Sequence, residues 1–260
     1  MSEHPGWKRA SVGLIATGLM AIASSAAQAA SECKQKISAA DKLLALNEVQ
    51  NLIGRYSHGM EEHGQDILPQ IFAMKTEGVS WRVPTGPNTI AGMKALFAHP
   101  AEDTRKYNGT LRMHAMLTPV IEVAADGKTA MGVWDSFGPQ VQNINSDTTW
   151  LWLKYGVDFV KEDGEWKIWH LQVFPVFNVP WKEGLAEYAR AQASAGEKPQ
   201  ARGPAMPGSE NWVGPKGAIW IYDGKTPLRG PRIPTPYCTY SDDISAAQYD
   251  DSGTAARPEQ

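Results

Sequence analysis

Two long segments of alternating sequence, each interrupted by an Asp-Gly pair, constrain the possible fold most strongly. The first spans residues 112–134 around Asp126-Gly127, and the second spans residues 150–170 around Asp163-Gly164. Asp-Gly tolerates the positive φ angles of tight hairpin turns, so each segment is predicted to form two antiparallel strands. Because these strands carry histidines, an aspartate and several tryptophans, they indicate a sheet around an aromatic-lined pocket.

Helical patterns come before this predicted sheet. Ser38 and Asp41 have capping-box spacing, and apolar residues then recur at helical intervals, which predicts a helix to about His58. Two further helices are expected at residues 65–74 and 90–99, and a short strand is expected between them at residues 78–84. Helices followed by a strongly antiparallel sheet indicate the α+β class.

The N-terminal segment has the pattern of a targeting signal. Lys8 and Arg9 precede an apolar run at residues 12–23, and small residues follow as far as Ala29. We therefore predict a signal peptide over residues 1–29, cleavage after Ala29, and a periplasmic or secreted protein. The apolar run is short for a membrane span, so no stable span is expected after cleavage; a retained anchor is the alternative to export.

The mature chain is predicted to hold one domain, residues 30–180, and a C-terminal extension, residues 181–260. The extension begins with a helical stretch and becomes rich in proline and glycine. Its aromatic residues argue against free disorder, so we expect it to wrap the domain or a neighbouring subunit. In an oxidising compartment, Cys33 and Cys238 could form a disulfide; two unrelated thiols are the alternative.

Composition and motifs argue against several classes of function. The chain has 25 basic and 28 acidic residues, a balance that does not recommend a nucleic-acid partner. It lacks Gly-x-Gly-x-x-Gly, Gly-x-Ser-x-Gly and His-Glu-x-x-His, which weakens nucleotide-binding, serine-hydrolase and zinc-protease interpretations. Two cysteines cannot make a cysteine-rich zinc site. We therefore predict a mechanism that uses neither metal nor cofactor.

Four segments together resemble a known family. They are the helix at residues 47–56, the stretch from Trp81 to Gly92, His114 before residues 119–123, and Tyr155 with residues 163–168. In this combination they resemble a SnoaL-like domain of the nuclear transport factor 2-like superfamily, over roughly residues 40–178. The resemblance implies a cone-shaped α+β barrel, in which helices close a curved sheet around a deep pocket. It also implies a homo-oligomer, either a dimer or a trimer.

Chemistry without a cofactor requires a proton acceptor, a proton donor and a group that stabilises negative charge. His114 is the best acceptor because imidazole titrates near neutral pH, and the resemblance places it where dehydratases of the superfamily carry a pocket histidine. The resemblance also implies that Tyr56 points into the cavity and that Glu61 lies where some relatives place an acid. Arg82 could pair with a substrate phenolate or carboxylate. The structural alternatives are a core histidine, a surface Glu61 and an Arg82 salt bridge at the sheet edge.

Two further polar residues lie on the predicted second hairpin. Strand alternation places His170 on the same face as Trp166, Ile168 and Gln172. If that face lines the pocket, His170 enters the site; if it is the other face, His170 joins a subunit interface. Asp158 on the facing strand could orient a histidine or act as a base, and a solvated carboxylate is the alternative.

The chain contains ten tryptophans, several of them on the predicted sheet. Flat apolar walls for an aromatic ligand are expected from Trp81, Trp134, Trp150, Trp152 and Phe174. The sequence therefore predicts a cofactor-independent lyase acting on a hydroxylated aromatic small molecule, such as a lignin-derived diaryl compound, with loss of water or formaldehyde. The alternatives are an isomerase or cyclase of a polycyclic or steroid-like substrate, a non-catalytic protein that binds aromatic ligands, and a structural subunit.

Overall fold

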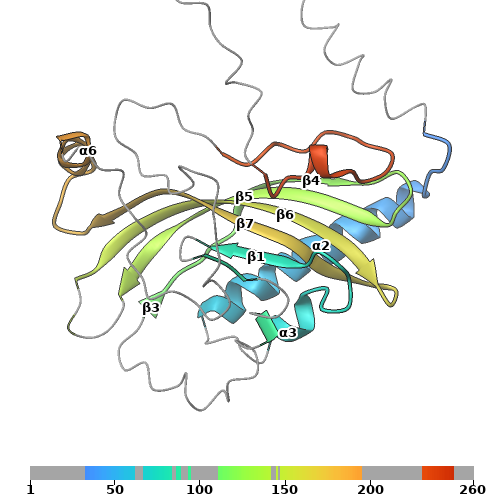
Figure 1. Cartoon of the computed structure of the whole chain (residues 1–260), viewed down its shortest axis with the longest axis horizontal. Coiled ribbons are helices and arrows are strands. Elements are labelled where there is room, and N and C mark those ends of the chain that lie inside the picture. The colour runs from blue at the N-terminus through green and yellow to red at the C-terminus, as the bar shows by residue number, and fades with distance from the viewer. Residues whose placement is uncertain are drawn as a thin grey trace, which may run out of the picture.

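A curled, mixed sheet forms the centre of the molecule (Figure 1). The computed structural model describes residues 33–61, 67–83, 86–88, 93–94, 111–141, 145, 147–194 and 230–248. Within them the strand order is β2-β1-β7-β6-β5-β3, and β4 also pairs with β5. The strands are β1 (Ser80–Val83), β2 (Gly86–Asn88), β3 (Leu111–Arg112), β4 (Leu117–Val123), β5 (Thr129–Val141), β6 (Thr149–Glu162) and β7 (Glu165–Pro180). Only the pairing of β1 with β7 is parallel among these described strands.

Both predicted hairpins are confirmed. Strands β4 and β5 meet at Asp126-Gly127, and β6 and β7 meet at Asp163-Gly164. In the second turn, Asp163 and Gly164 have φ angles of 53° and 84°, the left-handed region that this dipeptide tolerates. The local turn chemistry therefore determines where the two longest strands reverse.

The first predicted helix is confirmed, whereas the second was predicted too long. Helix α2 spans Ala39–Glu61, and Ser38 caps it as predicted: the Asp41 amide donates to Ser38 Oγ at 3.1 Å, and Ser38 Oγ donates to Asp41 Oδ2 at 2.7 Å. Helix α3 spans only Leu68–Ile71, because Phe72 is already extended and the Ala73 amide donates to Ile168 of the sheet at 2.8 Å. The predicted signal peptide and most of the predicted third helix lie outside the described residues.

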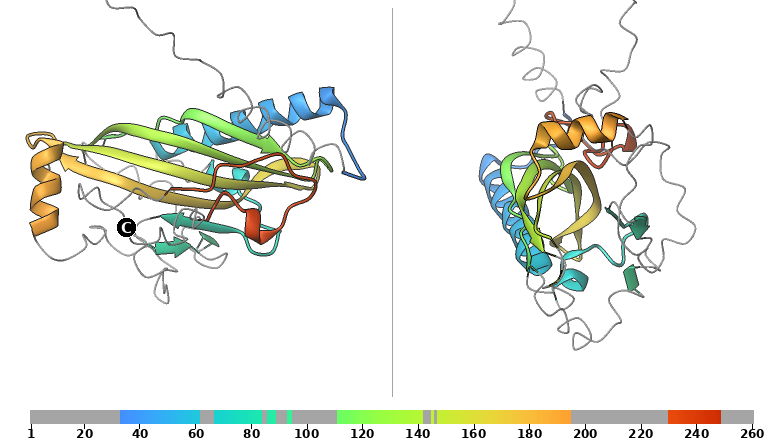
Figure 2. Two further views of the ribbon diagram at one scale, coloured as in Figure 1. Left: turned by 90° about the horizontal axis from the view of Figure 1, so that it is seen from above. Right: turned by 90° about the vertical axis from the view of Figure 1, so that its left-hand side faces the viewer.

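The main core lies between α2 and the sheet face that we call the inner face. Val49, Ile53 and Tyr56 of α2 pack there against Tyr155, Val157 and Phe159 of β6. Figure 2 shows in its end-on view how the strands curl alongside α2. No helix in the described part of the chain is both long and apolar enough to cross a membrane.

Strand β7 contains an irregularity that the sequence pattern did not predict. Asp158 is opposite His170, but the next residue, Phe159, is opposite Ile168, so Trp169 is an extra residue in the ladder. Ile168 consequently faces the inner core, whereas His170 shares the other face with Asp158. The predicted common face for His170, Trp166 and Ile168 is therefore wrong, because a bulge reverses the alternation.

The C-terminal segment 230–248, which we call the strap, lies along the opposite, outer face of the sheet (Figure 1). It includes the short 3₁₀ helix η1 (Asp242–Ile244) and packs on Met131 and Val133 of β5. A disulfide joins Cys33 to Cys238, so the first of the two cysteine interpretations is the one observed. Near the other end of the sheet, helix α6 (Leu185–Ser194) follows β7.

Candidate functional site

A buried row of polar aromatic groups crosses the inner core. The indole nitrogen of Trp81 donates to the Tyr56 hydroxyl at 3.1 Å. The rings of Tyr56 and Tyr155 are 5.9 Å apart and nearly perpendicular. The Tyr155 hydroxyl lies 2.9 Å from Nδ1 of His114, so the row ends at an imidazole. We call these four residues the aromatic relay.

Four separate elements supply the members of the aromatic relay. Tyr56 comes from the last turns of α2, Trp81 from β1 and Tyr155 from β6, while His114 lies in the segment between β3 and β4. Alternation along β6 directs Tyr155 inward with Val157. The segment around His114 is held by the neighbour of Tyr56, because Ser57 Oγ donates to the His114 carbonyl oxygen at 2.6 Å.

Burial controls the charge of the aromatic relay. Burial, followed by the nearby positive charge of Arg112, lowers the pKa of His114 from 6.5 to about 4. Burial also raises the pKa of Tyr56 and of Tyr155 far above that of an ordinary phenol. All three groups are therefore neutral at neutral pH, and their interactions there are hydrogen bonds.

The second ring nitrogen of His114 faces a different set of groups. Its Nε2 lies 3.5 Å from the side-chain amide nitrogen of Gln140. Gln140 is opposite Arg112 in the ladder between β3 and β5, so both side chains emerge from the same part of the sheet. A substrate group near Nε2 would meet the imidazole and the Gln140 amide, and the positive charge of Arg112 is near enough to lower the pKa of His114.

The predicted aromatic walls do not form one surface. Trp81 and Trp134 are buried in the inner core. On the outer face, Trp150 stacks between Phe137 and Trp181 at 4.9 and 4.8 Å. Trp152 lies on this face as well, since its indole nitrogen donates to Asp135 at 3.0 Å. Phe174 is buried opposite Lys154, on the outer side of the ladder.

Arg82 lies on the opposite face of the sheet from the aromatic relay. Arg82 is exposed and pairs with Gln172 in the ladder, which puts it on the His170 face and opposite to Trp81. Glu61 is the last residue of α2, and its side chain lies outside the described residues. Of the proposed catalytic residues, His114 and Tyr56 therefore share the aromatic relay, where Tyr155 lies between them.

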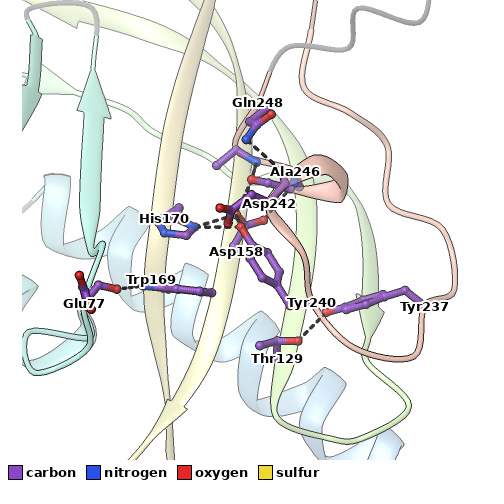
Figure 3. A network of polar contacts seen from close by, with 12 residues as sticks. Glu77, Thr129, Asp158, Trp169, His170, Tyr237, Tyr240, Asp242, Ala246 and Gln248 are labelled. Carbon is purple, nitrogen blue, oxygen red and sulfur yellow. Dashed lines mark hydrogen bonds and ion pairs between the residues drawn. The ribbon is translucent and has the colours of Figure 1, made fainter. Parts of the chain in front are cut away.

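Asp158 and His170 form a separate cluster beneath the strap (Figure 3). The Asp158 side chain is fully buried, and its Oδ2 lies 3.0 Å from Nδ1 of His170. The strap supplies three donors to the same carboxylate: Tyr240 hydroxyl at 3.1 Å, Ser245 Oγ at 2.5 Å and the Ala246 amide at 2.9 Å. Asp158 therefore contacts a histidine, but the cluster fixes the strap to the outer face, whereas His114 belongs to the inner core.

Sequence reasoning did not select four residues that contact or influence His114. Tyr155 is one of the residues on which the family resemblance rests. It lies two positions before the apolar Val157 on the same strand, and this spacing could have identified it as an inner-face residue. Ser57, Gln140 and Arg112 have no comparable signal, because their proximity depends on how α2, β3 and β5 meet. The described residues contain no group of three or more His, Cys, Asp or Glu placed to share a metal ion.

Comparisons with known proteins agree with this architecture. The sequence matches the SnoaL-like domain family over residues 41–172. The chain belongs to this family, and the predicted SnoaL-like domain with its cone-shaped α+β fold is confirmed. No curated protein matches the chain.

Several solved structures are similar to the chain. One is a type 2 hexachlorocyclohexane dehydrochlorinase (LinA), at 17% identity and a TM-score of 0.46, covering 56% of this chain and 95% of that chain. The type 3 LinA from Novosphingobium barchaimii LL02 has 17% identity and a TM-score of 0.45, with coverages of 56% and 97%. A nuclear transport factor 2-like superfamily protein from Salmonella enterica serovar Typhimurium has 20% identity and a TM-score of 0.42, with coverages of 55% and 96%.

Proposed function

We propose that the protein is a cofactor-independent lyase that acts on a hydroxylated aromatic small molecule and eliminates water or formaldehyde. The observation that carries this proposal is the contact between His114 and Tyr155, a 2.9 Å hydrogen bond inside an aromatic core. A neutral imidazole held by a buried phenol is suited to general acid–base catalysis, because it can accept a proton from the substrate and return it without a metal or nucleotide.

The surroundings of His114 support an aromatic substrate with oxygen substituents. Aromatic rings from α2, β1 and β6 form one buried row with the imidazole, Gln140 lies at Nε2, and Arg112 is opposite Gln140 in the ladder. A phenolate can expel a hydroxyl group from a para benzylic carbon. The phenolate oxygen supplies an electron pair through the ring to form a quinone methide, and the hydroxyl group leaves with the C–O bonding pair and takes up a proton to become water. Lignin-derived diaryl compounds have this arrangement, and in an exported, oligomeric protein they would be accessible without uptake into the cell.

The test is an incubation of the protein with a panel of lignin-derived and polyketide phenols, followed by mass analysis. Elimination lowers the product mass by water or formaldehyde, whereas an isomerase or cyclase leaves the mass unchanged. Replacing His114 by Ala should lower turnover roughly 100-fold or more. His58→Ala, which alters an exposed histidine on α2, is the matched control and should retain activity.

Two outcomes would contradict the proposal. One is unchanged turnover of a verified substrate by His114→Ala. The other is tight binding of aromatic compounds, visible as tryptophan quenching, with no product under any condition, since that result identifies a ligand-binding protein.

A further inference from the structure

A group of polar side chains projects from the outer face of the sheet where β1 pairs with β7. Ser80 is opposite His170, and two positions further along Arg82 is opposite Gln172. The residue between Ser80 and Arg82, Trp81, belongs to the inner core, so alternation directs its two neighbours outward. Arg82 and His170, both candidate catalytic residues, therefore lie together on the face that does not carry the proposed active site.

The contacts of His170 determine which of its ring nitrogens can accept a hydrogen bond. Its Nδ1 lies 3.0 Å from the Asp158 carboxylate, which is an acceptor, so Nδ1 carries a hydrogen and donates it (Figure 3). The strap directs three donors of its own at the same carboxylate. Nε2 is then the acceptor of a neutral His170. It points towards the chain that enters β1, because a Cβ atom at Gly78 would lie 3.6 Å from it.

Two neighbours of His170 have no partner within the described part of the chain. Ser80 is only 9% exposed, and its buried hydroxyl makes no hydrogen bond there. Arg82 is exposed and forms no ion pair with a described carboxylate. A buried hydroxyl without a partner is unfavourable, and such a group calls for a bound molecule or water that satisfies it. The three side chains therefore offer an acceptor, a hydroxyl and a guanidinium to a ligand.

We propose that Ser80, Arg82 and His170 form a second binding site, the outer site, for an aromatic carboxylate with a hydroxyl group on the opposite side of its ring. The planar guanidinium of Arg82 binds the carboxylate. The ligand hydroxyl donates to Nε2 of His170, and the Ser80 hydroxyl lies between the two ends. Two positions along a strand span about 7 Å, which is the scale of a benzene ring with two opposite substituents. The inference goes beyond the proposed function, because the sheet separates the outer site from His114.

The charge of the outer site favours a carboxylate over a phosphate. Arg82 contributes one positive charge, and His170 contributes none while it is neutral. The Asp158 carboxylate behind His170 is buried and already receives its hydrogen bonds from protein groups. A carboxylate balances the single positive charge, whereas a phosphate monoester would bring excess negative charge close to Asp158.

Calorimetric titration of the full chain with 4-hydroxybenzoate tests the outer site. We expect one molecule to bind there per chain. Benzoate, which lacks the hydroxyl group, and 4-hydroxybenzyl alcohol, which lacks the carboxylate, should each bind roughly tenfold or more weakly. Equal affinities for the three compounds would overturn the inference, and so would the absence of 4-hydroxybenzoate binding at millimolar concentration.

Arginine and histidine variants separate the outer site from the proposed active site. Arg82→Gln should weaken the binding of 4-hydroxybenzoate roughly tenfold or more. Arg55→Gln, which changes an exposed arginine on α2, is the matched control and should bind as the unmodified protein does. His114→Ala should also leave this binding unchanged. Binding that is lost in His114→Ala and retained in Arg82→Gln would overturn the inference.

Ser80→Ala separates a role in binding from a role in the fold. It should weaken the binding of 4-hydroxybenzoate. The free energy of unfolding without ligand should stay unchanged or rise, because the substitution removes a buried hydroxyl that has no partner. A clear loss of stability in Ser80→Ala, with unchanged binding, would show that the hydroxyl serves the fold and would contradict its place in the outer site.

Discussion

The close approach of the strap to β6 makes Gly156 a sensitive position. A Cβ atom at Gly156 would overlap the Ala246 carbonyl oxygen, well inside van der Waals contact, and would also crowd Pro231. Both obstacles are parts of the strap, and the Ala246 contact is backbone that cannot rotate away. Gly156→Ala should therefore lift the strap from the outer face near Asp158.

The loss of stability in Gly156→Ala can be estimated from the contacts that the strap makes with the buried carboxylate of Asp158. Displacement removes the Ser245 and Ala246 donors from Asp158, while His170 on β7 remains in place. Hydrogen bonds to a charged group contribute about 1.5–3 kcal/mol each, and the disulfide keeps part of the strap near the sheet. The two lost bonds amount to about 3–6 kcal/mol, and because the disulfide limits the displacement we expect the free energy of unfolding to fall by the lower part of this range, about 3–4 kcal/mol.

Chemical denaturation measures this loss, and hydrogen exchange of the Ala246 amide locates it. The matched control is Gly54→Ala in α2, where a Cβ atom meets no other atom within 4 Å. That substitution should leave the stability unchanged or raise it by up to about 1 kcal/mol. An Ala246 amide that stays protected in Gly156→Ala, together with unchanged stability, would refute the argument that the strap requires glycine at this position.

Three other predictions concern the aromatic relay and the disulfide. Because His114 has a pKa of about 4 when folded and 6.5 when unfolded, stability should fall as the pH drops through this range, by about 3 kcal/mol in total, and His114→Gln should remove this contribution from a denaturation series against pH. Replacing Cys33 and Cys238 together by Ser should lower the free energy of unfolding by about 2–5 kcal/mol under oxidising conditions, and the difference from the unmodified protein should disappear in reductant. Ser57→Ala removes the hydrogen bond to the His114 carbonyl and should lower kcat by roughly tenfold with KM nearly constant, measured once a substrate is known.

Features that depend on short stretches of sequence were predictable. The capping box at Ser38, the apolar face of α2 and the two Asp-Gly turns are local patterns, and each forms as expected. The resemblance added His114 and Tyr56, which the structure places in one row through Tyr155. Their joint location required a family pattern because they lie 58 positions apart in the sequence.

Features that depend on register were not predictable. A strand alternates only while its ladder is regular, and the extra residue at Trp169 moves His170 to the outer face. The same limitation affects Trp150, Trp152 and Phe174, which lie on the other face from Trp134. Nothing in the sequence indicated that Asp158 would receive its hydrogen bonds from Ser245 and Ala246, nearly ninety positions later.

The link between Cys33 and Cys238 makes the order of maturation matter. Cys238 belongs to the strap, which docks on strands that are synthesised much earlier. The disulfide therefore forms either after the sheet is complete or before it, and in the second case it traps an incompletely folded chain. In a reducing environment the outer face would be covered by non-covalent contacts alone. The redox state in which the chain folds therefore determines whether that covering is permanent or exchangeable.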